Sequence, residues 1–171
     1  MMDRWGNFRV LHQFALTEGH AASLLQGRDG YLYGSAVWPA TSLPSGRPLP
    51  SGILYRMAPS GHSFEVLYRF SQTDGNGHSM DGADCFEPLV GTNPGVFYGT
   101  ASLGGTNGSG TVFSYSLSKP NVVEIVHEFS GVNAVGANSD GAYGAAAMAS
   151  LFLSIRRILP YECRHHQRRT R

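Results

Sequence analysis

Short apolar runs with a period of two alternate with turn residues along most of this chain. Such runs, bounded by Gly, Pro, Asn or Asp, predict half-buried β-strands. The strands predicted in the first part of the chain are 10–14, 21–25, 31–36, 52–57 and 64–70. Asp29-Gly30, between the second and third runs, is a strong hairpin signal because Gly supplies the backbone angles of a tight turn. An irregular insert rich in Pro and Ser separates residues 36 and 52.

The strand pattern occurs in copies. Leu11-His12-Gln13-Phe14 returns as Leu67-Tyr68-Arg69-Phe70 and again as Val126-His127-Glu128-Phe129, with 56 and then 59 residues between successive Phe residues. Residues 96–101 repeat 31–36 at a constant offset of 65, and Gly110 repeats Gly52 at 58. A fixed period of this length is the sequence signature of a repeat architecture.

Four strands per copy, joined as meanders, form the unit of a β-propeller blade. We therefore expect an all-β, β-propeller-like array of four-stranded blades, with about two blades complete and a third truncated. The repeat domain spans 1–148, with units at about 10–65, 66–124 and, in part, 125–148. The open edge strands of such an array favour self-association.

Three phrases resemble the GloVer repeat, whose signature reads LYGTT…GG…GTVF. They are Tyr31-Leu32-Tyr33-Gly34-Ser35, Phe97-Tyr98-Gly99-Thr100 and Gly104-Gly105-Thr106-Asn107-Gly108-Ser109-Gly110-Thr111-Val112-Phe113. The resemblance covers roughly residues 10–148 and implies a β-propeller-like fold, a mainly bacterial occurrence and frequent export. It implies no common activity and no catalytic residues. The first copy departs from it, because the insert replaces the Gly-Gly loop there.

The pattern is lost after Met148, and residues 149–171 form a divergent basic tail. One interpretation is a truncated or frameshifted reading of the third copy. The other is a genuine closing helix, since apolar residues recur at helical spacing before Pro160. Under either interpretation the sequence predicts a short C-terminal helix at about 145–159.

Charge and composition exclude some classes of function. Residues 156–171 hold six of the 13 Lys and Arg residues and one of the 12 acidic residues, so the rest of the chain is net acidic. A net acidic body disfavours nucleic acid as a partner. Cys85 and Cys163 lack metal-ligand spacing, and Cys85 is expected to be a buried thiol. No apolar run suits a signal peptide or a membrane span, so we expect no membrane contact and leave the compartment open.

Candidate site residues come from an aromatic set and an acidic loop. Trp38, in the insert and expected to be exposed, and Tyr98 are candidates for stacking on a glycan or protein ligand. Asp74, Asn76 and Asp81 carry the oxygen ligands that Ca²⁺ prefers, although their loop lacks the glycine and glutamate of an EF-hand. No other cofactor is expected.

Recurring polar residues are more simply explained by the repeat than by catalysis. His12 and His127 share one repeat position, and Glu65 and Glu124 share another. We expect a non-enzymatic repeat scaffold or binding module with a protein or glycan ligand. The first alternative is a fragment of a polysaccharide-acting hydrolase or lyase, which would use paired carboxylates. The second is a remnant without function.

Overall fold

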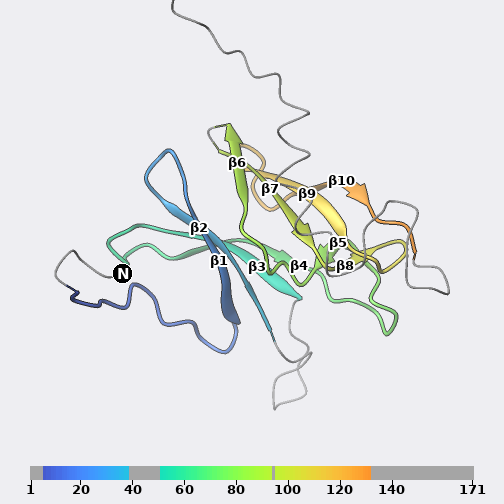
Figure 1. Cartoon of the computed structure of the whole chain (residues 1–171), viewed down its shortest axis with the longest axis horizontal. Coiled ribbons are helices and arrows are strands. Elements are labelled where there is room, and N and C mark those ends of the chain that lie inside the picture. Colours follow the sequence, from blue (N-terminus) through green and yellow to red (C-terminus); the bar gives the residue numbers. More distant parts are fainter. Residues whose placement is uncertain (1–5, 39–50, 94, 132–171) are drawn as a thin grey trace, which may run out of the picture.

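The computed structural model describes residues 6–38, 51–93 and 95–131 as antiparallel strands joined by turns and loops (Figure 1). Sheet 1 is a meander of β1 (His20–Gln26), β2 (Leu32–Val37), β3 (Gly52–Met57) and β4 (Glu65–Phe70). Sheet 2 contains, from edge to edge, β6 (Val90–Asn93), β7 (Val96–Ala101), β9 (Thr111–Ser116) and β10 (Val123–Glu128). For these residues, the predictions of an all-β architecture and of four-stranded antiparallel sheets are confirmed.

One predicted strand, 10–14, is wrong, because this segment joins neither sheet. Its backbone runs past the turn before β4, so close that a Cβ on Gly61 would meet the Leu11 carbonyl oxygen at 2.6 Å. Alternation specifies which side chains are buried, but a strand also needs a neighbour for its backbone hydrogen bonds. The predictions for the insert beyond Trp38, for the third unit beyond residue 131, for the helix and for the tail lie outside the described residues.

A two-stranded ladder of β5 (Ser79–Ala83) and β8 (Leu103–Gly105) is not predicted by the sequence pattern. Gly82 and Gly104 have positive φ angles of 91° and 92°. A Cβ on Gly104 would lie 2.5 Å from the Cα of Gly82, so the two backbones approach more closely than any side chain would allow. Because glycine has no side chain to bury, these strands leave no period-two signal.

Corresponding residues of the two sheets occupy corresponding positions in the two ladders. Gly34 on β2 pairs with Tyr55 on β3, and Gly99 on β7 pairs with Phe113 on β9. In each pair the aromatic ring covers the glycine, because a Cβ at that position would collide with the ring. The repeat seen in the sequence is therefore also present in the strand pairing.

A β-bulge falls at the same place in the last strand of each sheet. In sheet 1 the pairing of β4 with β3 continues on both sides of Leu67, which has no partner on β3. In sheet 2 the pairing of β10 with β9 passes over Val126 in the same way. A bulge increases the local twist of its strand, so the two last strands bend alike.

Each sheet has two faces, which we call front and back. The front face carries Leu32, Ala36, Tyr55 and Met57 in sheet 1 and their counterparts Phe97, Ala101, Phe113 and Tyr115 in sheet 2. The back face carries Tyr33 and Leu54 in sheet 1 and Tyr98 and Val112 in sheet 2.

The back face of sheet 1 packs on the front face of sheet 2 in a single apolar core. The rings of Tyr33 and Phe97 meet there with centroids 4.2 Å apart. The Tyr115 hydroxyl donates a hydrogen bond across the core to the Leu67 carbonyl oxygen, at 3.3 Å. The two sheets are therefore stacked in one direction, back against front, as successive units of an array would be.

The front face of sheet 1 is partly covered by the N-terminal segment 8–14. Phe14 packs on Tyr55 with centroids 5.3 Å apart and an interplanar angle of 71°. In the next unit Phe70 of β4 packs on Phe113 with 5.2 Å and 63°. The segment 8–14 thus holds the place on sheet 1 that β4 holds on sheet 2.

An edge-to-face pair of rings two residues apart occurs in all three copies. The pairs are His12–Phe14 (4.8 Å, 84°), Tyr68–Phe70 (5.1 Å, 80°) and His127–Phe129 (5.0 Å, 84°). Edge-to-face contact at this distance is a favourable arrangement for aromatic rings. Its recurrence supports a packing role for this position, whichever ring occupies it.

Candidate functional site

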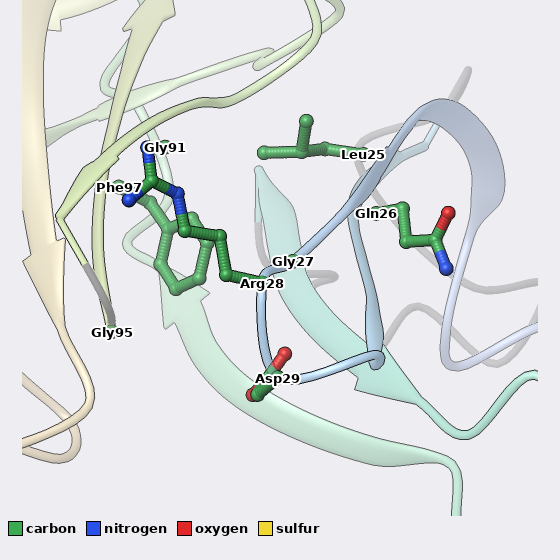
Figure 2. Close-up of a pocket in the computed structure, with 8 residues that line it drawn as sticks. All are labelled: Leu25, Gln26, Gly27, Arg28, Asp29, Gly91, Gly95 and Phe97. Carbon is green, nitrogen blue, oxygen red and sulfur yellow. The ribbon is translucent and has the colours of Figure 1, made fainter. Parts of the chain in front are cut away.

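A pocket of about 180 Å³ lies between the two sheets, at the end that carries their first hairpin turns (Figure 2). One wall is the end of β1 and the turn that leads to β2, and the other is the hairpin of β6 and β7. Three of the wall positions are glycines, which have no side chain to fill the space. The lining residues are Leu25, Gln26, Gly27, Arg28, Asp29, Gly91, Gly95 and Phe97.

The turn between β1 and β2 is held by backbone hydrogen bonds and by Asp29. The Gly27 N–H donates to the Tyr31 carbonyl at 2.8 Å, and Gly30 has a φ of 85°, which confirms the predicted hairpin. The Asp29 carboxylate accepts a bond from the Tyr31 N–H at 3.1 Å and one from the Tyr33 hydroxyl at 2.6 Å. Burial, and then the bond to Asp29, raise the pKa of Tyr33 to about 12. Asp29 therefore serves to fix this wall.

Arg28 is the cationic residue of the pocket. Figure 2 shows its side chain reaching from the turn toward Gly91 and Phe97, whereas Gln26 points away from it. No hydrogen bond or ion pair joins the guanidinium to another residue within the described ranges. A guanidinium presents N–H donors in a planar fork that matches a carboxylate. The pocket thus offers an anion-binding group beside an aromatic wall.

Arg28 is not among the residues that the sequence pattern singles out. Its neighbours indicate only a turn, and a single exposed arginine in a turn carries no functional signal of its own. The signal that could have found the pocket is the repeat: Gly30 and Gly95 are 65 residues apart and both have positive φ, 85° and 77°. Equivalent turns of adjacent units lie next to each other when the units stack.

Trp38 and Tyr98, the predicted ligand-stacking residues, lie on different surfaces. Trp38 is half-buried against the front-face cluster of sheet 1, and its indole N–H donates to the Leu16 carbonyl at 2.7 Å. Tyr98 is half-buried on the back face of sheet 2, in the position that Tyr33 occupies in sheet 1. The structure does not bring them together into one platform.

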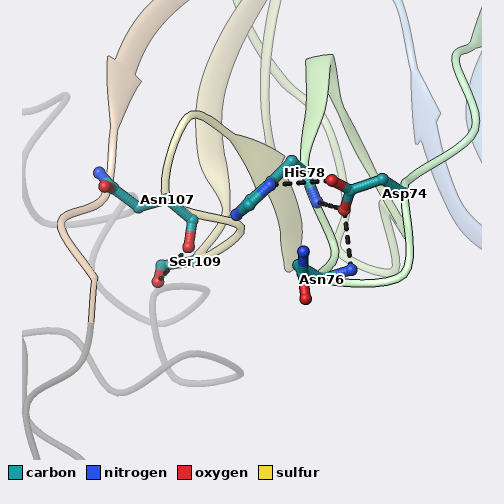
Figure 3. Close-up of polar contacts among 5 residues, drawn as sticks. All are labelled: Asp74, Asn76, His78, Asn107 and Ser109. Atoms are coloured by element: carbon teal, nitrogen blue, oxygen red, sulfur yellow. Dashed lines mark hydrogen bonds and ion pairs between the residues drawn. The ribbon is translucent and has the colours of Figure 1, made fainter.

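The acidic loop before β5 closes on itself. Asp74 accepts bonds from the backbone N–H groups of Asn76 at 2.8 Å and His78 at 2.9 Å, and these two bonds hold the pKa of Asp74 below its usual value. Its second oxygen lies 3.0 Å from Nδ1 of His78. Figure 3 shows the imidazole between Asp74 and the loop that carries Asn107 and Ser109.

Asp81 serves a different set of partners. Its carboxylate accepts bonds from the Tyr68 hydroxyl at 2.6 Å, from the Ser71 hydroxyl at 3.0 Å and from the Ser71 N–H. The structure therefore engages Asp81 with the end of β4, apart from the Asp74 turn. Within the described ranges no three His, Cys, Asp or Glu side chains come together in a metal-binding group. Calcium binding by Asp74, Asn76 and Asp81 stays a prediction.

Each of the recurring carboxylates Glu65 and Glu124 has a cationic neighbour, on β3 for Glu65 and in the connection from β9 to β10 for Glu124. Glu65 lies 2.7 Å from Arg56, and Glu124 lies 2.6 Å from Lys119. Each glutamate therefore has a local ion-pair partner. This favours a structural role for the two residues over a catalytic pair of carboxylates.

His12 and Glu18 form a contact beside the N-terminal segment. Nε2 of His12 is 2.9 Å from the carboxylate of Glu18, and its ring stacks on Phe64 with centroids 3.8 Å apart. Burial acts to raise the pKa of Glu18, but the Ala15 N–H and His12 outweigh it, so that the pKa is lowered. The pair ties the segment 8–14 to the turn that precedes β1.

Cys85 is buried, as the sequence predicts. Burial, with the charges of Asp84 and Asp81, raises the pKa of its thiol well above the usual value. A neutral buried thiol is a poor nucleophile.

The described residues form an all-β structure with a repeat-like arrangement, in which two antiparallel four-stranded sheets stack in one direction. Comparison with family models, curated proteins and solved structures finds no match. Within the described residues no helix has the length and apolar character needed to cross a bilayer.

Proposed function

We propose that this chain is a non-enzymatic, β-propeller-like repeat scaffold of the GloVer type that binds an acidic glycan at Arg28. The one-directional stacking of sheets 1 and 2 supports the architecture, because blades of a propeller are repeated in this way around an axis. The recurring ring pairs and glycine–aromatic pairs support a repeat built by copying one unit.

The observation that carries the binding proposal is the guanidinium of Arg28, which reaches into an inter-sheet pocket without a protein partner among the described residues. A carboxylate is the ligand group that its planar donor fork fits best. Phe97 supplies an apolar wall beside it, although only 4% of its surface is exposed. A sugar that carries a carboxylate combines these two features.

The size of the pocket limits what can enter. Pockets for drug-sized ligands measure roughly 300–1,000 Å³, whereas this one measures about 180 Å³. It therefore accepts one sugar unit of a longer chain. With a single charged contact at an exposed site, we expect a dissociation constant near 1 mM, which corresponds to about 4 kcal/mol.

A titration monitored by NMR tests this proposal. Oligogalacturonate added to the ¹⁵N-labelled chain is expected to shift the amide signals of Gly27, Arg28 and Gly95, and its methyl-esterified form is expected to have no effect. Arg28→Ala should abolish the shifts. Arg69→Ala, which removes the same charge from β4, should leave them unchanged. Equal shifts with Arg28→Ala, or shifts confined to other regions, would contradict binding at this pocket.

The alternative is a polysaccharide lyase, and the pairing of Asp74 with His78 is the observation that favours it. A carboxylate that orients an imidazole through Nδ1 leaves Nε2 to act as a general base. A lyase would release an unsaturated sugar from a uronate polymer, which is detected by its ultraviolet absorbance. Product formation that is lost in His78→Ala but retained in Arg28→Ala would replace the binding proposal with this one.

A further inference from the structure

An open apolar groove of about 430 Å³ lies between the segment 8–14 and the front face of sheet 1. We call it the N-terminal groove. Phe8, Val10 and Leu24 are 76%, 63% and 52% exposed along it. Large apolar side chains exposed together in this way mark an interaction surface. The lining residues include Phe8, Val10, Ala21, Leu24, Tyr55 and Met57.

The groove occupies a defined place in the repeat. On sheet 2, the corresponding front face is covered by the back face of sheet 1, which contributes Tyr33 from β2 and Phe70 from β4. On sheet 1, the segment 8–14 supplies the counterpart of β4, through Phe14. Within the described residues nothing supplies the counterpart of Tyr33. Leu32, the counterpart of Phe97, pairs with Met57, and Met57 lines the groove.

The complementary surface is the back face of sheet 2. Tyr98 and Val112 are the counterparts of Tyr33 and Leu54. Tyr33 and Leu54 are 0% exposed, because sheet 2 covers them, whereas Tyr98 and Val112 are only half-buried. The described part of the chain thus has an incompletely covered back face on sheet 2 and an incompletely covered front face on sheet 1.

We propose that the back face of sheet 2 of one copy docks into the N-terminal groove of a second copy. The evidence for this occupant is the contact between sheets 1 and 2, where the same two kinds of surface already fit together within one chain. Tyr98 then takes the role of Tyr33, and Leu24 and the segment 8–14 enclose it. Such a contact joins unlike surfaces, so it produces rings or open chains rather than a twofold dimer. It uses neither Arg28 nor the pocket beside it, so it goes beyond the binding proposal and can fail independently.

Sedimentation velocity over a range of concentrations tests the docking. The wild-type chain is expected to associate as concentration rises. Tyr98→Arg, on the back face, and Leu24→Arg, in the groove, should each weaken association by roughly tenfold or more, since each places a charge in the contact. Met80→Arg is the matched control, because Met80 is 91% exposed on β5 and belongs to neither surface.

A mixing experiment identifies the geometry. The Tyr98→Arg chain keeps an intact groove, and the Leu24→Arg chain keeps an intact back face. Each variant alone should be monomeric, whereas an equimolar mixture should form a dimer. Association between like surfaces, or pairing of sheet edges, would not be restored by mixing, and that result would overturn the proposal.

Folding of the variants is checked by circular dichroism and thermal unfolding. If Tyr98→Arg does not fold, Leu24→Arg and Val10→Asp still test the groove, because both positions are more than half exposed. A wild-type chain that stays monomeric at all concentrations overturns the proposal. In that case a large loss of thermal stability in Tyr98→Arg would show that residues of the same chain cover the back face of sheet 2.

Discussion

The ring of Tyr33 packs against the ring of Phe97 with 4.2 Å between centroids and 34° between planes. Tyr33 comes from the first copy of an aromatic-glycine phrase and Phe97 from the second, yet they are not equivalent residues. The counterpart of Tyr33 is Tyr98, and the counterpart of Phe97 is Leu32. One phrase therefore supplies both sides of the contact between successive units.

This contact predicts that replacing two equivalent tyrosines, Tyr33 and Tyr98, lowers the stability of the chain by different amounts. Tyr33→Ala should lower the free energy of unfolding by about 3–5 kcal/mol, the range for removing a buried ring. Tyr98→Ala should cost clearly less at a concentration where the chain is monomeric, because Tyr98 is only half-buried. Denaturant unfolding followed by circular dichroism measures both. Equal costs would mean that the two back faces are equally covered.

The glycine beneath Tyr55 should not tolerate a methyl group. A Cβ on Gly34 would meet the Tyr55 hydroxyl at 2.5 Å and would also collide with the Ser23 carbonyl oxygen. Gly34→Ala is therefore expected to lower the free energy of unfolding by about 1–3 kcal/mol, because the added methyl group overpacks the site. Gly75→Ala is the matched control, because nothing lies within 4 Å of its added Cβ. A neutral Gly34→Ala in thermal unfolding would contradict the close packing of β2 and β3.

Stability should fall at alkaline pH. Burial, with the bond to Asp29 as a second cause at Tyr33, raises the pKa of Tyr33 and of Tyr55 to about 12 from a usual value of 10.0. Because the unfolded chain loses these protons first, the stability they contribute is complete below pH 10 and is lost as pH rises toward 12.

Melting temperatures between pH 9 and pH 12, together with tyrosinate absorbance, measure this effect. Tyr33→Phe and Tyr55→Phe should each make the dependence on pH shallower. An unchanged slope in both variants would show that other groups cause the alkaline loss.

Asp81 should act as a structural acceptor. Asp81→Ala leaves the Tyr68 hydroxyl and the Ser71 N–H without their acceptor, and loss of a charged acceptor costs about 1.5–3 kcal/mol. Asp74→Ala, in an exposed loop, should cost less. Repeating the melts with added Ca²⁺ checks the metal interpretation: a calcium-dependent rise in melting temperature that Asp81→Ala abolishes would support a metal site.

Phe14 should hold the segment 8–14 in place without contributing to the stability of the two sheets. Phe14→Ala removes the contact with Tyr55, so amide exchange in 8–14 should become faster while β7 and β9 stay protected. Phe70→Ala, which removes the corresponding contact with Phe113, should accelerate exchange in both sheets, because Phe70 is 1% exposed within the core. Identical exchange patterns for the two variants would contradict this division.

Much of the fold can be predicted from the sequence, because alternation and repetition report directly on which side chains are buried. The runs at 31–36 and 96–101 become β2 and β7, and their offset of 65 reappears in the pairing of Gly34 and Gly99. The segment 10–14 has the same alternation as these strands, but whether it pairs depends on a neighbour that the local pattern does not specify. The ladder of β5 and β8 depends on backbone contact at glycine, which leaves no pattern at all.

The candidate site is less predictable for the same reason. Residue type suggested Trp38 and Asp81, but Trp38 donates its indole N–H to a backbone carbonyl and Asp81 binds Tyr68 and Ser71. Arg28 is notable only for its position, in a turn that lies next to the equivalent turn of the following unit when the units stack. Such a site is a property of packing between copies, whereas the sequence describes each copy separately.

The shared bulge and register have a consequence for folding. Because Leu67 and Val126 are bulged at the same position, β4 and β10 present the same pairing register to their neighbours β3 and β9. Repeat proteins are prone to exchange of equivalent strands between units. During folding, the correct partners are therefore selected mainly by the short connections from β3 to β4 and from β9 to β10, which bring each strand to its own neighbour first. Lengthening either connection should slow folding by allowing the wrong copy to compete.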